Sequence, residues 1–429
     1  MTLSSDRPQV AFAALRHASF RAYFAASAAA MMADNIEHVI SYWVMFEKFH
    51  SPALAGFAVV SHWLPFLLFS VYFGALADRY DCRRIIQAAL LLFMSVSLAW
   101  GVLFMTGTLE MWHAMVLLTL HGIAGVIWGP ASQLLIHDIV GPDRLQSAVR
   151  LSATSRQLGL LMGPAVGGVL MLLLGPPAGL LINALIYLPL LVWLWKVPYD
   201  GHRRHAAAAP HQTAPPHQAA APRQAAPRRL PGLADTMTLL RQISGDRTIF
   251  SMIVLAGVSS FFVGNAFQAQ MPEYAHDLGT DDAGVRYSIL LGANAAGALA
   301  SGLVLESRGL LQARPLTAII FTALWCLVIT GFAAATSYPL AVALMFVAGF
   351  LNLAYSAMSQ TLVQLRAPAQ LRGRLIGLYN TASSGLRAFS GVTVGVLGSM
   401  IGIHWSLAAS ALALFAAAIA LWAFSMRAR

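Results

Sequence analysis

Apolar runs of about twenty residues recur along the chain, and short polar or charged turns separate them. A helix of ~20 apolar residues spans the ~30 Å hydrocarbon layer of a bilayer. Backbone groups in lipid must be hydrogen-bonded within their own segment, so such runs form helices. We predict twelve transmembrane helices, at residues 18–46, 53–76, 84–106, 111–138, 145–174, 178–197, 248–272, 284–306, 314–335, 338–366, 373–402 and 404–426.

Composition agrees with this pattern. Of the 429 residues, 58% are hydrophobic and only 10% are charged, whereas roughly 25% of a soluble domain is charged. The predicted fold class is therefore an all-α polytopic membrane protein. The first apolar run continues through Asp34 to about Phe46, which is too long for the apolar region of a secretory signal, so we expect it to be retained as the first helix.

A low-complexity stretch divides the helices into two groups of six. We predict an N-terminal six-helix bundle over 1–197, a disordered cytoplasmic linker over 198–247 and a C-terminal six-helix bundle over 248–429. The stretch is rich in Ala, Pro and His and too poor in large apolar residues to fold alone. Because nothing fixes its histidines in a coordination geometry, we favour a flexible tether over a metal site. These histidines are His202, His205, His211 and His217.

Basic residues predict the orientation. If the helices alternate, nearly all Arg and Lys fall on one side of the membrane, and only Lys48 and Arg286 fall on the other. The positive-inside rule then places both termini and the linker in the cytoplasm, in a bacterial-type inner membrane. The net charge of +10 is scattered through the loops and not gathered on one face, which argues against nucleic-acid binding.

The loop between the second and third apolar runs reads Gly74-Ala-Leu-Ala-Asp-Arg-Tyr-Asp-Cys-Arg-Arg84. Gly74 allows two helices to approach closely. Asp78 and Arg79 stand at the end of one helix, and Arg83 and Arg84 open the next. We predict that this gating loop latches a helix pair at one face and is released when the protein changes shape.

This pattern of Gly, three residues, Asp-Arg and a closing Arg pair resembles the loop between helices 2 and 3 of major facilitator superfamily transporters. Asp81 stands where the general pattern has a second Gly, as in the branch that includes the enterobactin exporter. The residues around Glu306 form only a degenerate copy, so we expect a weaker latch there. The family implies two six-helix bundles with pseudo-twofold symmetry and alternating access.

Two further segments are similar to the same family. The run Leu371–Asn380 with Arg387 resembles helix 11 of the enterobactin-exporter branch. Small residues in the fifth run resemble the helix 5 signature of the antiporters, and they favour close helix packing. This predicted packing motif comprises Gly163, Pro164, Gly167 and Gly168.

Ionisable residues within bilayer depth are costly and are therefore candidates for function. Asp34, Glu37 and His38 share one face of the first helix through their i, i+3, i+4 spacing. Asp34 lies about 20 Å inward from Arg21 at 1.5 Å per residue. A carboxylate pair at that depth could exchange protons near neutral pH. We predict a proton or cationic-substrate site; the alternative is an Asp34 that only bonds Asn35 or a neighbouring helix.

Three basic side chains complete the candidate site. Arg387 lies about as deep as Asp34, and we expect it to meet a carboxylate, a carbonyl or an anionic substrate. Arg156 in the fifth run is a second candidate. His121 falls where antiporters of the family have a buried Arg in helix 4, and it could titrate in its place; a structural role is an equal alternative for His121 and Arg387. We expect His62 to be structural.

The predicted function is secondary active transport. The chain has no Gly-x-x-x-x-Gly-Lys-Ser/Thr loop of an ATP-driven pump and no His-Glu-x-x-His of a metalloprotease, so we do not expect an enzyme. We predict proton-coupled efflux of amphipathic small molecules, such as a siderophore or drug, by a monomer that needs no cofactor beyond the proton gradient and no metal. The alternatives are a lipid-moving relative that acts on lysophospholipids and, more remotely, a non-transporting receptor.

Overall fold

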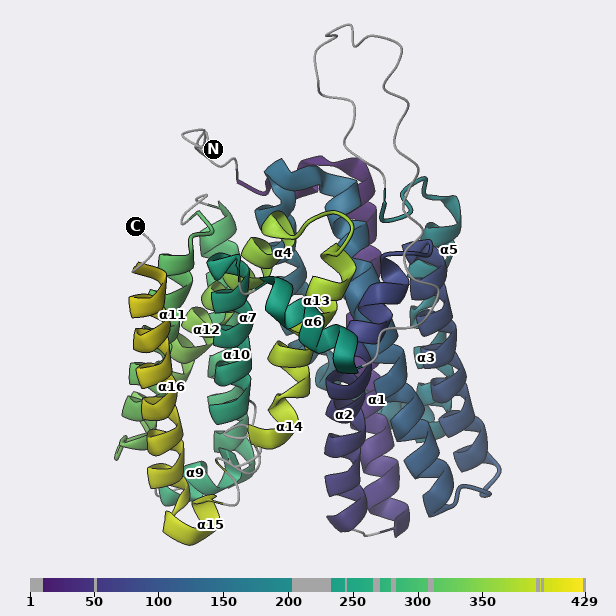
Figure 1. Ribbon diagram of the computed structural model, residues 1–429. Coiled ribbons are helices and arrows are strands. Elements are labelled where there is room, and N and C mark those ends of the chain that lie inside the picture. Colours follow the sequence, from purple (N-terminus) through teal and green to yellow (C-terminus); the bar gives the residue numbers. More distant parts are fainter. Residues whose placement is uncertain are drawn as a thin grey trace, which may run out of the picture.

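The structure is a computed structural model that describes residues 11–49, 52–202, 233–243, 245–264, 271–278, 283–307, 312–390, 394 and 397–426. The described residues are helical, with short turns between the helices and no strand. Figure 1 shows two groups of helices side by side, one built from the first half of the chain and one from the second.

The first half opens with a short 3-10 helix and continues through long helices. Its elements are η1 (Ala13–Arg16), α1 (Ala18–Phe49), α2 (Pro52–Ala77), α3 (Cys82–Met105), α4 (Met111–Ile186) and α5 (Leu188–Lys196). Gly141 and Gly175 interrupt α4 with positive φ values of 71° and 79°, which a residue with a Cβ adopts only at a cost. The stretch 111–196 therefore folds as three helices, close to the predicted 111–138, 145–174 and 178–197.

The second half has more interruptions. Its elements are α6 (Leu233–Ile243), α7 (Arg247–Phe262), α9 (Met271–Asp277), α10 (Ala283–Ser307), α11 (Pro315–Ala333), α12 (Tyr338–Arg366), α13 (Arg372–Asn380), the π-helical turn η2 (Thr381–Gly385), α14 (Arg387–Ser390), α15 (Leu397–Ile401) and α16 (Ile403–Met426). Between α7 and α9, residues 265–270 of the predicted helix 248–272 lie outside the described residues.

Two predicted segments differ from the structure. The predicted helix 373–402 contains the π-helical turn η2, where Gly385 packs directly on the backbone of Leu67 in α2. The predicted disordered linker 198–247 contains a helix, α6, whose Leu239 and Ile243 are buried against α7. The sequence of α6 has an apolar face that the low-complexity stretch before it lacks. Residues 203–232 of that linker lie outside the described residues.

The exterior is apolar, as expected for a protein in lipid. Leu172, Leu173, Met400 and Trp405 are each at least 74% exposed. A water-soluble monomer rarely exposes large apolar patches. Eight helices among the described residues are long and apolar enough to cross a membrane, and two of them, Met111–Pro164 and Val166–Lys196, include the turns of the interrupted α4. The fold is that of a polytopic protein with twelve transmembrane helices in two six-helix bundles.

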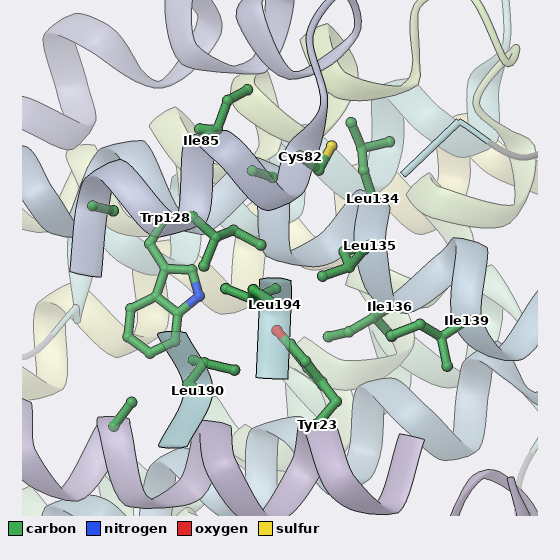
Figure 2. Close-up of a cluster of buried hydrophobic side chains, with 14 of the residues drawn as sticks. Tyr23, Cys82, Ile85, Trp128, Leu134, Leu135, Ile136, Ile139, Leu190 and Leu194 are labelled. Atoms are coloured by element: carbon green, nitrogen blue, oxygen red, sulfur yellow. The ribbon is translucent and has the colours of Figure 1, made fainter. Parts of the chain in front are cut away.

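Each half has its own buried core. In the first half, Tyr23 of α1, Trp128 of α4 and Leu190 of α5 pack together with residues of α3, and Figure 2 shows this cluster. In the second half, a separate cluster joins α9, α10, α11, α12 and α16. The first cluster also takes in Ala357 and Ile376 of the second half, and Ala153 of α4 packs with Ala298 and Leu353, so buried apolar contacts connect the two halves.

Candidate functional site

A cavity of about 700 Å³ lies between the two halves. The first half contributes Asp34, Trp63 and Arg156 to its wall, and the second half contributes Tyr355 and Arg387. This volume suits a drug-sized molecule. Three of the predicted site residues, Asp34, Arg156 and Arg387, therefore face one space, although they lie on three different helical segments.

His121 links the two predicted carboxylates. Its Nε2 lies 2.9 Å from Oδ1 of Asp34, and its Nδ1 lies 2.7 Å from Oε1 of Glu37. Asp34 lines the cavity, whereas Glu37 and His121 are 2% and 5% exposed and lie behind it. When both acids are ionised, both ring nitrogens donate and the imidazole is protonated. A chain of proton-binding groups thus runs from the cavity wall into the first bundle.

Two more histidines adjoin this chain. Nδ1 of His38 donates to the backbone carbonyl of Asp34 at 2.7 Å, and Nε2 of His38 lies 3.3 Å from Nδ1 of His62. The ring of His38 also meets the ring of His121 edge to face, with centroids 4.6 Å apart. The expectation that His62 is merely structural missed this arrangement. Helical spacing identified His38, but only the packing of α2 on α1 and α4 reveals His62.

Arg387 takes a different partner from the one expected. Its guanidinium carbon lies 5.2 Å from the centroid of the Trp63 ring, a cation–π contact across the cavity between the two halves. Among the described residues, no carboxylate forms an ion pair with it. Of the partners expected for Arg387, a carboxylate is therefore not seen among the described residues, and an anionic substrate stays a prediction. The carboxylates of α1 instead contact His121, because α4 packs directly beside α1.

Arg156 reaches the same cavity from α4 and is exposed to it. Tyr23, Tyr379 and Arg387 line the same cavity. Two guanidinium groups in one cavity, with no carboxylate in an ion pair with either among the described residues, leave a positive charge that a bound anion could neutralise.

The predicted packing motif positions α1 and hence Asp34. A Cβ on Gly163 would collide with the side chain of Asn35, and one on Gly167 would lie 3.6 Å from Ile36. These glycines let the two backbones approach as predicted. Pro164 lines the cavity. Gly168 is the exception, because no atom lies within 4 Å of where its Cβ would be. It does not belong to the contact.

The gating loop joins the two halves. Asp78 follows α2 and accepts hydrogen bonds from the backbone amides of Gly373 at 2.5 Å and Arg374 at 2.9 Å, at the start of α13. A carboxylate at a helix N-terminus satisfies amides that lack partners within the helix. A Cβ on Gly74 would collide with the carbonyl oxygen of Gly373. Burial raises the pKa of Asp78 to about 6, although the two amides oppose this shift.

Arg83 of the same loop makes its contacts within the first half. Arg83 pairs with Asp81 at 2.7 Å and donates to the carbonyl of Val197 at 2.6 Å, so it fixes the start of α3 within the first half. Arg79 is partly buried and Arg84 is exposed. Of the five predicted gating residues, Asp78 and Gly74 touch the second half directly, while Arg83 holds the turn in shape.

A second junction lies at the end of α10. Oγ of Ser147 donates to a carboxylate oxygen of Glu306, and Nη1 of Arg150 donates to the carbonyl of Leu305 at 2.9 Å. Glu306 and Arg150 are 3% and 1% exposed. A contact between the halves is therefore present here too, and the expectation that this latch is the weaker one stays a prediction. The loop sequence is degenerate, but the one carboxylate that makes the contact is kept.

Comparisons with known proteins agree with this architecture. The sequence profile of the Major Facilitator Superfamily matches residues 22–391. Macrolide efflux protein A of Streptococcus pyogenes is 23% identical over 395 residues, which cover 90% of this chain and 91% of that protein. The staphyloferrin A transporter of Staphylococcus aureus is 25% identical over 189 residues, which cover 42% of this chain and about half (48%) of that protein.

Solved structures show the same fold. The transporter FucP in its outward conformation aligns with a TM-score of 0.69 at 14% identity, over 96% of this chain and 99% of that one. The proton:xylose symporter XylE aligns with a TM-score of 0.67 at 14% identity, over 95% of this chain and 96% of that one. The motifs, the two six-helix bundles and these matches lead to one conclusion: the chain belongs to the major facilitator superfamily of transporters.

Proposed function

We propose that this protein exports amphipathic small molecules in exchange for protons by alternating access. The observation that carries the proposal is the chain Asp34–His121–Glu37, which begins at the wall of the central cavity and ends in the buried interior of the first half. A proton that enters from the cavity can bind there, and its charge changes how the cavity holds a substrate. The name of macrolide efflux protein A supports the direction of transport, and the name of the staphyloferrin A transporter supports the substrate class.

The substrate we propose is an amphipathic molecule with an anionic group, such as a siderophore or drug. Arg156 and Arg387 supply the positive charge, and Trp63, Tyr355 and Phe66 supply aromatic surface in the same cavity. Guanidinium groups bind carboxylates through paired hydrogen bonds. In this proposal the two arginines bind the anionic group of the substrate. The aromatic side chains contact its apolar part with less selectivity.

The conformation fits one step of that cycle. Both junctions between the halves, at Asp78 and at Glu306, follow even-numbered transmembrane helices and so lie on one side of the membrane. We propose that this side is cytoplasmic, as the basic loops indicate. The cavity would then be closed to the cytoplasm, and breaking the two junctions would admit substrate from that side.

The remaining parts of the proposal follow from the same features. We place the protein in a bacterial-type inner membrane with both termini in the cytoplasm, and we propose that it works as a monomer driven by the proton gradient without a cofactor. The family and fold are those of transporters and not of enzymes. We propose no nucleic-acid partner.

The test begins with a screen of candidate substrates for stabilisation of the purified protein against thermal unfolding. The best stabiliser is then loaded into proteoliposomes, and its transport is followed with and without an imposed pH gradient. We expect transport to accelerate with the gradient and to fall back when nigericin collapses it. Equal rates in the two conditions would rule out proton coupling, whatever the substrate.

A further inference from the structure

Three histidines and one carboxylate gather where α1, α2 and α4 meet. We propose that His38, His62, His121 and Asp34 form a binding site for one divalent transition-metal ion such as Zn²⁺ or Co²⁺. Imidazole with one carboxylate is a donor set that suits these ions and discriminates against Mg²⁺ and Ca²⁺. The role of this site in transport rests on the proposed function, because the metal ion and the coupling proton would both bind at Asp34 and His121.

The distances match the edges of a coordination polyhedron. Nε2 of His38 and Nδ1 of His62 are 3.3 Å apart, and Nε2 of His121 and Oδ1 of Asp34 are 2.9 Å apart. Two ligands bound to zinc at about 2.0–2.1 Å in a tetrahedron lie about 3.3 Å from each other. One ligand atom from each of the three histidines lies within 4.8 Å of the other two. Shifts of about 1 Å along flexible side-chain torsions would close the remaining edges.

In two of the three histidines, His38 and His121, the other ring nitrogen is already held as it is in metal sites. Nδ1 of His38 donates to the carbonyl of Asp34, which leaves Nε2 with its lone pair available. Nδ1 of His121 faces Glu37 at 2.7 Å. A metal ligand usually donates its second nitrogen to a carbonyl or carboxylate in this way. The ion would replace the proton on Nε2 of His121, and His62 would carry its own proton on Nε2.

A small void provides the room. It measures about 10 Å³ and is bordered by Glu37, His38, His62 and His121. That volume holds about one water molecule or ion. His38 and His62 also line the large central cavity. An ion can therefore enter from the cavity. Glu37 at the void and Asp34 at the cavity wall, both in contact with His121, offset its double charge.

The ion could arrive free or inside an organic chelate. A chelator with carboxylate groups would fit the same cavity, because Arg156 and Arg387 stand on its wall. Both sources share one chemistry, which is an imidazole-rich site for a divalent ion. The experiment separates them by presenting the ion alone or as its citrate complex.

The primary measurement is Co²⁺ binding to the purified full-length chain in detergent after treatment with a chelator. We expect one Co²⁺ per chain, with the intense visible absorption of a four-coordinate nitrogen and oxygen site, and displacement by Zn²⁺. His38→Asn and His62→Asn should each weaken binding by at least about tenfold. His404→Asn is the matched control, because His404 lies in the second half beside Asp277 and should bind no worse.

A second control removes the linker histidines. The variant with His202, His205, His211 and His217 all changed to Asn should keep the Co²⁺ spectrum. X-ray absorption of the zinc-loaded wild type, which depends on no variant folding, should show about three imidazoles. Three results would overturn the proposal: no binding of one Co²⁺ per chain, an X-ray absorption spectrum without imidazole ligands, or a loss of binding in the linker variant alone.

Presenting the metal as the free ion or as its citrate complex shows which of the two forms the site binds. Radiolabelled citrate retained with the metal indicates a chelate, and metal retained without citrate indicates the free ion; both outcomes support the site. The test measures binding and needs no transport. Proton-driven transport could therefore fail while the metal binds, or persist in metal-free buffer while no metal binds, so the two proposals can fail separately.

Discussion

The two halves of the protein share a scaffold but differ in the chemistry that they bring to the cavity. The wall from the first half carries Asp34 and His38, backed by Glu37 and His121. The wall from the second half, among the described residues, has Arg387 as its charged group beside amide, hydroxyl and aromatic side chains. Among the described residues, the carboxylate and the histidines of the cavity wall therefore all come from the first half.

The junctions between the halves are symmetric by contrast. A carboxylate at the end of α2 meets the start of α13, and a carboxylate at the end of α10 meets the segment of α4 after Gly141. Asp78 and Glu306 thus occupy equivalent places. We therefore expect substitutions in the cavity to have large effects that differ between the two halves. Substitutions at the two junctions should have smaller effects of similar size.

The largest effect is expected from His121→Phe. The change removes both hydrogen bonds to the carboxylates and leaves Glu37 buried without its partner. We expect a loss of roughly 3 kcal/mol in the free energy of unfolding and no proton-driven transport. Thermal unfolding and proteoliposome transport measure the two. His404→Phe, whose partner Asp277 is 43% exposed, should cost less than about 1 kcal/mol; equal losses would argue against the one-sided picture.

Arg387→Met should mainly weaken substrate binding. A charged hydrogen bond contributes about 1.5–3 kcal/mol, so affinity for an anionic substrate should fall roughly 10- to 100-fold. Substrate titrations followed by tryptophan fluorescence would measure this, because Trp63 lies under the guanidinium. Arg366→Met, at an exposed position at the end of α12, is the control. Unchanged affinity in Arg387→Met would remove the second half from substrate recognition.

Asp78→Ala and Glu306→Ala should open the same side of the protein to similar extents. Each loses a buried carboxylate contact between the halves, which contributes about 1–2 kcal/mol. Cysteine-accessibility labelling in the cavity, from the side of the two junctions, would report roughly 5- to 30-fold more opening in each variant. If only Asp78→Ala increased the opening, the latch would be asymmetric, as the sequence motif predicts.

The smallest effect is a pH dependence of the Asp78 junction. Burial raises the pKa of Asp78 from 3.8 to about 6 in the closed state, against the pull of Arg374 and His202. The closed state therefore binds the proton more tightly than a hydrated, open state does. This contribution to closure is complete below about pH 4 and is lost as the pH rises through about 6.

Lowering the pH from about 7.5 to about 5 should thus favour closure at this junction by up to about tenfold. Distances between spin labels on the ends of α2 and α13 would measure it. Asp78→Asn should remove this part of the pH dependence while the Asp34 network is intact. A pH response of the same size in Asp78→Asn would assign it to other groups.

Sequence reasoning found the features that depend on local patterns. The apolar runs predicted the helices, and the spacing of Asp34, Glu37 and His38 predicted their shared face because helical geometry alone determines it. His121 was predicted as a site residue, but its hydrogen bonds to both carboxylates were not, since they depend on how α4 packs against α1. The π-helical turn η2 in the eleventh transmembrane helix was also missed, because local sequence does not reveal the close packing of Gly385 on α2.

The central claim is that proton coupling belongs to the first half and begins at Asp34. It is tested most directly by Asp34→Asn in proteoliposomes, with Asp277→Asn of the second half as the matched control. We predict that Asp34→Asn abolishes transport driven by a pH gradient while exchange of labelled for unlabelled substrate continues, and that Asp277→Asn retains both. Undiminished gradient-driven transport by a folded Asp34→Asn protein would contradict the account.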